Sequence, residues 1–413
     1  MPSFASALSA LNADTTAIDV VGNNLANINT PGFKDSTVSF YDLVTESIGA
    51  GLGSTQVGFG VGTPVTLANF SQGAIESTGG PLDAAIQGGG FFVVNAANGN
   101  QEYTRGGNFQ VNTDGDLTTS TGELVQGWSQ VDGVLDTNLP LSNIIVPVGS
   151  LTPPQVTTTT SVDLNLNAAG VAGSSTGTFS TSVQVYDSLG EPHTVTFAFA
   201  ATTTPNQWTY SASIPAGDTT SPSTPVTGTL TFDSSGNLIS PASTDPAPVI
   251  SAPGLTDGAA DLNITWNLYN GTTPDITQYA QASATSAVAQ NGSAAANLVS
   301  VGLANGGVVL AQYSNGQQID VGQMAVASIR NPESLIAAGD NNFQASSLTA
   351  LPAIGVPGSG GRGTVVGGSV ESSTVDIATE FTNLIIYQRS YEANAHVVTT
   401  IDQLSQDTIA LKQ

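Results

Sequence analysis

Apolar residues recur every seven positions near both ends of the chain, and no other feature restricts its fold as strongly. Near the N-terminus they are Phe4, Leu11, Ile18 and Leu25, with Leu8, Val21 and Ile28 beside them. Near the C-terminus they are Ile377, Leu384, Tyr391 and Val398, flanked by Phe381, Ile385, Ala395, Ile401 and Leu404. This spacing places the side chains on one stripe of an α-helix. We therefore predict helices over about residues 4–28 and 376–411.

A helix with a single apolar stripe is marginal when alone in water, so each predicted helix requires a partner. The helix at the other terminus is one candidate, and a second copy of the same chain is another. Alternatively, both helices could face the core of an ordinary globular domain. The candidate assembly residues are the stripe positions Leu8, Leu11, Ile18, Leu25, Ile377, Leu384, Tyr391 and Val398.

Between the two helices, β-strand and turn signals dominate. Short alternating runs separated by Gly, Pro, Asn and Asp are typical of antiparallel sheets. The predicted strands are Phe91–Val94, Tyr103–Val111, Leu117–Ser120, Leu124–Trp128, Phe179–Tyr186, His193–Phe199, Trp208–Ile214, Gly228–Phe232 and Leu262–Leu268. Their length and spacing favour a β-sandwich or a barrel-like domain over βαβ units. We also expect a β region over about residues 299–345, a linker or an edge strand at Thr157–Thr160, and a loop over residues 352–368.

The order of these segments predicts a nested arrangement. A single hydrophobic core stops growing at roughly 250–300 residues, and this chain has 413. We predict a mixed, mainly β fold in which the terminal α-helices form a coiled coil and one β-rich domain is inserted into another. The predicted parts are a helical layer (1–28 and 370–413), connecting segments (29–75 and 355–369), an inner β domain (76–146 and 285–354) and an outer β domain (147–284).

Composition removes several classes of function. The chain has 6 Lys and Arg against 31 Asp and Glu, a formal net charge of −25 and no cysteine. Without a basic patch, binding to nucleic acid or to an anionic membrane surface lacks its main electrostatic contribution. The absence of Cys excludes disulfides, thiolate zinc sites and a Cys nucleophile. No apolar run approaches the roughly 18 residues of a membrane span. The first cation, Lys34, comes too late for a secretory signal peptide, so the chain reads as cytoplasmic unless another route exports it.

Few residues could carry catalysis. The two lysines stand at positions 34 and 412, and neither completes a G-x-x-x-x-G-K-[ST] phosphate loop. The segment Gly173–Gly177 matches a nucleophile elbow in its letters, but it lies in a Gly- and Ser-rich loop before a predicted strand instead of between a strand and a helix. We therefore predict no enzyme and no cofactor.

Metal-ligating residue types are equally sparse. Asn112, Asp114 and Asp116 have the spacing of half a calcium loop, but no Gly or Glu follows in register, so we interpret them as a hairpin turn. His193 precedes an alternating strand, and we place it on a sheet surface. His396 falls within the C-terminal helix, where we expect an exposed or interfacial side chain. The sequence therefore predicts no metal site.

Particular residues at the two ends carry a family resemblance. Asn23–Lys34 reads NNLANINTPGFK and resembles the N-terminal signature of the bacterial flagellar axial proteins, the family of rod, hook and hook-associated proteins. Val370–Asp376, followed by Glu380, Gln388–Tyr391 and Ala393–Ala395, resembles the matching C-terminal signature. In the N-terminal signature, Pro and Gly suit the second and third positions of a turn that ends the helix. The candidate residues of this signature turn are Asn27, Thr30, Pro31, Gly32 and Phe33.

The resemblance extends into the β-rich part of the chain. Leu82–Val94 and Tyr103–Phe109 resemble the first β domain shared by rod and hook members of the family. Val185–Gly190, leading into His193–Phe197, and Tyr313–Gln317 resemble the hook-type members. Residues 200–280 carry the least resemblance.

The resemblance implies a structural subunit, many copies of which polymerise into the curved, flexible tube that joins the rod of the flagellar motor to the filament and transmits torque. It also implies that the terminal helices line the central channel, that the inner β domain forms the middle layer and that the outer domain faces outward. The implied partners are other copies of the chain, the rod, hook-cap and hook–filament junction proteins, and the flagellar export apparatus. Export through that apparatus would place the chain outside the cell without a cleaved signal peptide.

Two alternatives remain open at the level of sequence. A distal rod protein, or another axial component, would keep both terminal signatures. A secreted β-rich adhesin or carbohydrate-binding module would account for the strands, but it would leave the terminal heptads unexplained.

Overall fold

The computed structural model describes residues 2–43, 45–48, 55–130, 134–149, 151–220 and 224–410. The chain divides into two compact units. Unit 1 comprises Met1–Val148, Ser300–Gln312 and Gln318–Gln413, and unit 2 comprises Gly149–Val299 and Tyr313–Gln317. Two long helices and many short strands make up these units, so the predicted mixed, mainly β fold is confirmed. The finer division of unit 1 into a helical layer, connecting segments and an inner β domain stays a prediction.

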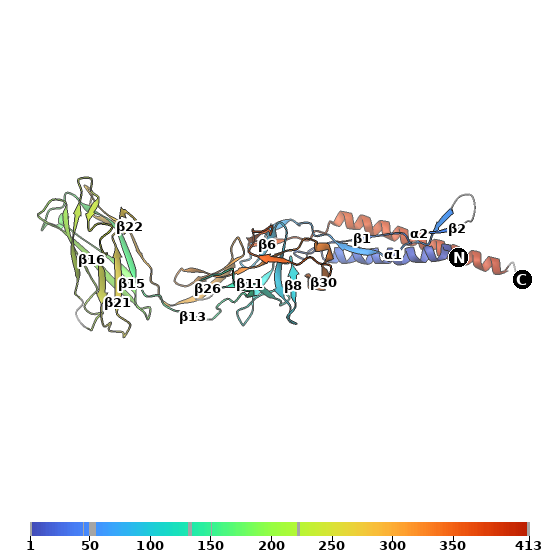
Figure 1. Cartoon of the computed structure of the whole chain (residues 1–413), viewed down its shortest axis with the longest axis horizontal. Helices are drawn as coiled ribbons and strands as arrows, with labels where there is room; N and C mark the ends of the chain where they lie inside the picture. Colours follow the sequence, from blue (N-terminus) through green and yellow to red (C-terminus); the bar gives the residue numbers. More distant parts are fainter. Residues whose placement is uncertain are drawn as a thin grey trace. The chain divides into compact units, whose positions relative to one another are not determined.

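Two helices in unit 1 lie side by side over most of their length (Figure 1). α1 spans Pro2–Ala26 and α2 spans Ile377–Ala410, close to the predicted bounds; Leu411 lies outside the described residues. The carboxylate of Asp376 caps α2 by accepting a hydrogen bond from the Thr379 amide at 2.8 Å, as expected of an N-cap acid. Among the described residues, neither helix combines the length and the apolar character needed to cross a membrane.

A ladder of short strands accompanies the helix pair. β1 (Ser36–Ser39) pairs antiparallel with β4 (Val65–Ala68), and β2 (Thr45–Ile48) pairs with β3 (Thr55–Gly58). Just after β1, the ring of Phe40 lies 5.9 Å from that of Tyr387 on α2. The segment that follows α1 therefore packs back along the helices before the chain enters the β-rich part of unit 1.

The main sheet of unit 1 combines strands from both sides of the inserted unit. Part of it follows the order β28-β11-β7-β8-β31-β30. The strands of this path are β7 (Phe91–Asn95), β8 (Gln101–Thr104), β11 (Leu124–Ser129), β28 (Gln318–Met324), β30 (Ile336–Gly339) and β31 (Asn342–Gln344). Because β11 pairs with β28, and β8 with β31, the chain leaves this sheet, builds unit 2 and returns. The predicted nesting of the two β-rich domains is confirmed.

Shorter strands complete unit 1. They are β5 (Ile75–Ser77), β6 (Ala84–Gln87), β9 (Phe109–Val111), β10 (Leu117–Thr119), β12 (Ser142–Asn143), β27 (Val308–Tyr313, which ends in unit 2), β29 (Val326–Ser328), β32 (Ala353–Gly355), β33 (Thr364–Gly367) and β34 (Ser369–Glu371). β33 pairs with β6 and β34 with β5. The loop predicted over residues 352–368 thus contains short strands, which sequence periodicity does not detect at this length.

Unit 2 is a β-sandwich, one of the two architectures predicted for it. One sheet has the order β15-β16-β17-β18-β19, and the other has the order β20-β21-β14-β24 with β25 also on β14. Their bounds are β14 (Thr159–Asn167), β15 (Thr178–Tyr186), β16 (Pro192–Ala201), β17 (Gln207–Ser213), β18 (Val226–Phe232), β19 (Leu238–Ser240), β20 (Val249–Ala252), β21 (Leu262–Asn267), β24 (Ile276–Tyr279) and β25 (Ala284–Gln290). Short strands of two residues are β13 (Leu151–Thr152), β22 (Tyr269–Asn270) and β23 (Thr273–Pro274). The strand that leads back to unit 1 is β26 (Ala296–Leu303).

The core of unit 2 forms between these two sheets. Trp266 of β21 meets Phe197 of β16 with ring centroids 4.7 Å apart, and Tyr210 of β17 at 5.1 Å in an edge-on arrangement. Val162, Leu164 and Leu166, which alternate along β14, are buried in the same cluster. Aromatic side chains of this size dominate the burial of apolar area in such a core.

The position of β14 corrects the expectation of a linker or an edge strand at Thr157–Thr160. β14 pairs with β21 and β24 in parallel and with β25 antiparallel, so it lies inside its sheet. The run of threonines conceals the strand, because the apolar residues of its alternating pattern begin only at Val162. Parallel partners far along the chain leave no local signal in the sequence.

Candidate functional site: the terminal helix pair

Small and polar side chains make up most of the buried face of α1. The buried residues of α1 are Ala7, Ala13, Asp14, Ala17, Val21 and Asn24. Of these, Ala7, Asp14 and Val21 are seven apart, as are Ala17 and Asn24, so they form a heptad seam of their own. Small residues in such a seam allow the two helix backbones to approach closely.

Asp14 is the polar centre of this seam. Its Oδ2 atom accepts hydrogen bonds from Ser390 Oγ and Asn394 Nδ2 of α2, both at 3.0 Å. A buried carboxylate is costly unless its hydrogen bonds are made. Sliding one helix along the other would break both bonds, so Asp14 specifies the register of the pair.

A second polar contact closes the seam near the end of α1. Asn24 Nδ2 donates to Glu380 Oε1 at 3.1 Å and to the Ser36 carbonyl at 2.8 Å, while Asn24 Oδ1 accepts from the Ser36 amide at 3.0 Å. Burial raises the pKa of Glu380, and the negative charges of Asp35 and Asp376 act in the same direction. Asn24 therefore joins α1, β1 and α2 at a single point.

The predicted assembly residues lie beside this seam. Leu8, Ile377 and Tyr391 are 47%, 52% and 42% exposed. Leu11, Ile18, Leu25, Leu384 and Val398 are half-buried. On α1 the buried seam runs one position earlier, with Ala7, Ala17 and Asn24 buried in place of Leu8, Ile18 and Leu25. The bulky stripe of α1 therefore lies beside this buried seam, and the polar bonds of Asp14 and Asn24 hold the pair in register. A role for the stripe between copies of the chain stays a prediction.

Both helices carry exposed large apolar side chains. On α2, Ile377, Phe381, Leu384 and Tyr391 recur at spacings of four, three and seven, which is one face of a helix. The exposed large apolar residues of the two helices are Phe4, Leu8, Ile377, Phe381, Ile385, Ile386, Tyr391, Val397, Leu404 and Ile409. We call this set the apolar flank. Its members lie on more than one face of α2, and exposed apolar side chains gathered in this number on one element indicate an interaction surface.

The signature turn forms where α1 ends. The Phe33 amide donates to the Thr30 carbonyl at 3.2 Å, and Thr30 Oγ1 donates to Asn27 Oδ1 at 3.1 Å. Asn341 Nδ2 donates to the Pro31 carbonyl at 2.9 Å, which ties the turn to the sheet region. Gly32 has a φ of +70°, and a Cβ there would lie 2.3 Å from the carbonyl carbon of Arg105. Only glycine fits this position without displacing the backbone.

A buried ion-pair cluster lies directly beyond the turn. Lys34 Nζ donates to Glu371 Oε1 at 2.6 Å, and Arg105 Nη1 donates to Glu371 Oε2 at 2.9 Å. Gly73 also donates its amide to Glu371 Oε1 at 2.8 Å, and Arg105 Nη2 donates to the Gly88 carbonyl at 2.8 Å. Burial lowers the pKa of Lys34, although its bond to Glu371 opposes that change. The cluster connects the segments that follow α1 and precede α2 to the sheet region of unit 1.

The sequence analysis did not single out Asp14, because a search for apolar periodicity passes over polar residues. Asn24, Glu371 and Glu380 lie within the two family signatures, but no contact was predicted for them. One signal was present. Asp14 and Asn24 fall on the heptad positions of Ala7, Ala17 and Val21, and polar residues at such positions specify register in coiled coils. The ion-pair cluster has no comparable signal, since its members are distant in the chain.

The structure also shows where the other motifs from the sequence lie. Asn112 Oδ1 accepts from the amides of Asp114 and Asp116 at 2.9 and 2.8 Å, so this segment is the predicted hairpin turn. His396 is exposed on α2, as expected. The placement of His193 on a sheet surface is wrong: it is 6% exposed, because its alternating strand turns it towards the interior, where carboxylates face it.

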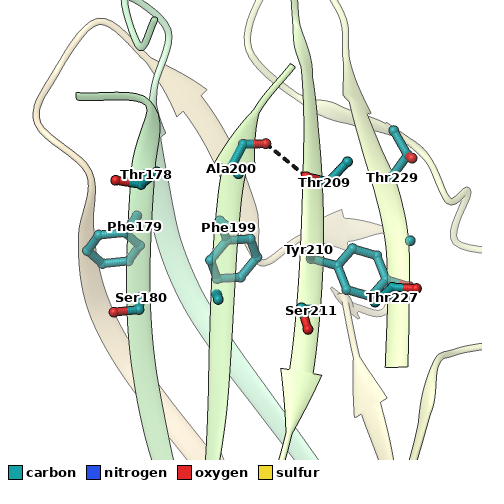
Figure 2. A pocket seen from close by; sticks show the side chains of 12 residues that line it. Thr178, Phe179, Ser180, Phe199, Ala200, Thr209, Tyr210, Ser211, Thr227 and Thr229 are labelled. Carbon is teal, nitrogen blue, oxygen red and sulfur yellow. Dashed lines mark hydrogen bonds between the residues drawn. The ribbon is translucent and has the colours of Figure 1, made fainter. Parts of the chain in front are cut away.

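Unit 2 contains a hollow of about 680 Å³ on its β15-β16-β17-β18 sheet. Figure 2 shows the rings of Phe179, Phe199 and Tyr210 in a row across neighbouring strands. Gly228 leaves space for the Tyr210 ring, since a Cβ there would lie 2.5 Å from it. Among the described residues that line the hollow, none carries a charge, so it offers no carboxylate, imidazole or amine for acid–base chemistry.

Full-length relatives identify the family. The flagellar hook protein FlgE of Borreliella burgdorferi is 32% identical to this chain over 450 residues, with 100% of both chains covered. The chain belongs to the flagellar hook protein family. The flagellar hook proteins FlgE of Salmonella typhimurium and Escherichia coli K12 are 33% and 31% identical, each over 99% of this chain and 100% of the relative.

Four family models match successive parts of the hook subunit. They are "Flagella basal body rod protein" at residues 4–34, "Flagellar hook protein FlgE/F/G D1 domain" at 85–173, "Flagellar basal body protein FlaE D2 domain" at 155–293 and "Flagellar basal body rod FlgEFG protein C-terminal" at 366–411. The two models named for the basal body rod match the ends, whereas the hook proteins match the whole length. The chain is therefore a structural subunit of the flagellar hook, as the resemblance implied.

A solved structure has a similar fold. The crystal structure of the Helicobacter pylori flagellar hook protein FlgE2 aligns with a TM-score of 0.53 at 15% identity, covering 70% of this chain and 98% of that chain. At this identity the likeness concerns the fold alone. It supports the mainly β architecture of the hook subunit.

Proposed function

We propose that the hook tube is held together by the apolar flank, which neighbouring copies of the chain bury on one another when they polymerise. The single observation that carries this proposal is the number of exposed large apolar side chains on both helices, among them Phe381 at 51% and Leu404 at 60% exposed. Covering such side chains stabilises association by about 25 cal/mol for each Å² of apolar area removed from water. The predicted stripe residues Leu8, Ile377 and Tyr391 belong to this flank.

The seam inside each chain supports this assignment. Asp14 and Asn24 already occupy the inner face of α1 with hydrogen bonds to α2, so the flank is not required to hold the pair together. The buried cluster around Glu371 joins the pair to the sheet region of the same unit. A force applied to the helices would therefore pass to the β-rich part, as a torque-transmitting joint requires.

The proposal extends to the partner proteins of the subunit and to its route of export. At the ends of the tube the apolar flank would meet the rod, hook-cap and hook–filament junction proteins in place of another copy. The subunit would reach the outside of the cell through the flagellar export apparatus without cleavage of a signal peptide, and it would act without catalytic activity. The uncharged lining of the hollow in unit 2 supports this last point.

The substitution Phe381→Asp tests the proposal. Phe381 is exposed, so the monomer should keep its fold, whereas a carboxylate buried between copies without a partner is costly. Thr382→Asp, at an exposed polar position of the same helix, adds the same charge as a matched control. We expect sedimentation and electron microscopy to show tubes for Thr382→Asp and monomers for Phe381→Asp. Normal tubes from Phe381→Asp would remove the flank from the interface.

A further inference from the structure

One histidine of unit 2 lies among three carboxylates that come from separate segments of the chain. His193, near the start of β16, has its Nε2 atom 3.2 Å from Asp187 Oδ2 and 4.0 Å from Asp257 Oδ2. Its Nδ1 atom lies 3.0 Å from Asp218 Oδ2. Nothing in the assembly of the helix pair uses these residues, and all of them belong to unit 2.

Asp187 is held so that one of its oxygens points towards the imidazole. Its Oδ1 atom accepts the amides of Leu189 and Glu191 at 2.8 and 2.9 Å, in the tight turn between β15 and β16. Oδ2 is left to face His193, and the whole side chain is buried. Because the turn and the two hydrogen bonds from its amides fix this carboxylate, Asp187 is already oriented to bind a ligand beside His193.

The two ring nitrogens have different surroundings. When the Nδ1–H group donates to Asp218, the lone pair of Nε2 remains free, with Asp187 and Asp257 as the neighbouring carboxylates. A carboxylate on the far nitrogen is the usual partner of a metal-ligating histidine, since it sets the tautomer and the ring orientation. Asp218 occupies that position.

The three remaining groups are close enough to share one ion. Ligand atoms of Asp187, His193 and Asp257 all lie within 4.8 Å of one another. An ion at about 2.0–2.2 Å from each ligand is compatible with such separations. Three carboxylates around one imidazole carry excess negative charge whether or not the imidazole is protonated, and a divalent cation would offset that charge. The side chain of Asp257 is 26% exposed to solvent, so an ion could enter the cluster from the Asp257 side.

We propose that Asp187, His193 and Asp257 bind a divalent transition-metal ion, with Asp218 as the carboxylate that orients His193. One imidazole nitrogen and two carboxylates favour an ion such as Zn²⁺ over Mg²⁺ and Ca²⁺, which prefer oxygen ligands alone. The bound ion would link the β15–β16 turn to the segment before β21. It would therefore stiffen this end of the sandwich rather than take part in a reaction.

The test is a calorimetric titration of the untagged full-length chain, freed of metals by a chelator, with ZnCl2, MgCl2 and CaCl2 in separate runs. We expect one saturable Zn²⁺ site and a higher unfolding temperature of unit 2 in the presence of Zn²⁺. Neither Mg²⁺ nor Ca²⁺ should saturate the site at the same concentrations. A chain without a saturable Zn²⁺ site overturns the proposal.

Four variants assign the site to these residues. His193→Ala should abolish saturable binding, and Asp257→Asn should weaken it at least tenfold while its Oδ1 still accepts the Ala259 amide. Asp218→Asn should weaken it by about 10–100-fold, the range measured for outer-shell partners. Asp261→Asn is the matched control, because Asp261 binds the Gly254 amide outside the cluster, and it should bind Zn²⁺ as the unchanged chain does. If His193→Ala fails to fold, the Asp257 and Asp218 variants decide. Wild-type affinity in both would overturn the proposal, whatever the chain does in tube assembly.

Discussion

Lys34 and Glu371 form an ion pair of 2.6 Å across 337 positions of the chain, and neither side chain is accessible to solvent. Lys34 lies in the segment between α1 and β1, and Glu371 ends β34, the strand that precedes α2. The carbonyl of Glu371 also accepts the Gly32 amide at 2.7 Å. The two termini are therefore joined to each other at the place where both enter the β-rich part of unit 1.

Glu371→Gln should destabilise unit 1 severely. It leaves Lys34 and Arg105 buried without their counter-ion, and removal of one partner from a buried ion pair costs about 3–5 kcal/mol. The measurement is urea unfolding followed by the helical circular dichroism signal, which arises from α1 and α2. Glu333→Gln, at an exposed carboxylate, is the control. An unchanged unfolding midpoint for Glu371→Gln would show that the cluster contributes nothing net.

Gly32→Ala should destabilise unit 1 more than Gly79→Ala. Both glycines have nearly the same φ, +70° and +68°, but a Cβ at Gly79 meets nothing within 4 Å. The backbone conformation alone costs about 1–2 kcal/mol for alanine, which is the loss expected at Gly79. At Gly32 the collision with Arg105 adds to that loss. Equal unfolding free energies of the two variants would contradict the close approach of the turn to Arg105.

Glu380 should make the stability of the helix pair depend on pH. Burial raises its pKa in the folded chain above the ordinary glutamate value of 4.5, so the folded state binds the proton more tightly than the unfolded state. The resulting stability is fully present below pH 4.5 and is lost as the pH rises through the folded pKa. Glu380→Gln should therefore be more stable than the unchanged chain at pH 7 and no more stable at pH 4, as measured by urea unfolding at each pH. A difference of the same size at both pH values would exclude the titration of Glu380 as its cause.

Leu384→Asp should abolish tube assembly while leaving unit 2 folded. Leu384 is half-buried on α2, beside the apolar flank, so a carboxylate there loses solvent when copies associate and finds no partner. Electron microscopy reports the tubes, and the fluorescence of Trp208 and Trp266 in the core of unit 2 reports its fold. Normal tubes from this variant would contradict a role for the stripe.

The net charge predicts a salt dependence of the tube. Each copy carries a formal charge of −25, and repulsion between stacked copies is screened over a Debye length of about 10 Å at 0.1 M salt. We expect the sedimenting fraction to increase from low to moderate ionic strength. Tubes that dissolve as moderate salt is added would instead mean that attractive ion pairs between copies dominate.

Much of the fold could be predicted from the sequence, because its evidence is local. The heptads mark both helices, and alternating runs mark strands such as Phe91–Val94 and Phe179–Tyr186. β14 was not recognised as a central strand, since its position depends on parallel partners about a hundred residues away. The signature around Pro31 and Gly32 indicated the family before any geometry was known.

The sequence by itself therefore determined the periods of the helices and strands, the turn that ends α1, and membership of the flagellar axial family. Only the tertiary structure decided that small and polar residues, with Asp14 bonded to Ser390 and Asn394, occupy the seam of the helix pair and leave the bulky stripe at its side. It also decided which charges meet, at Glu371 and around His193. The physical reason is range: a hydrophobic period depends on neighbours within a few residues, whereas the partner of a buried polar group depends on the path of the whole chain.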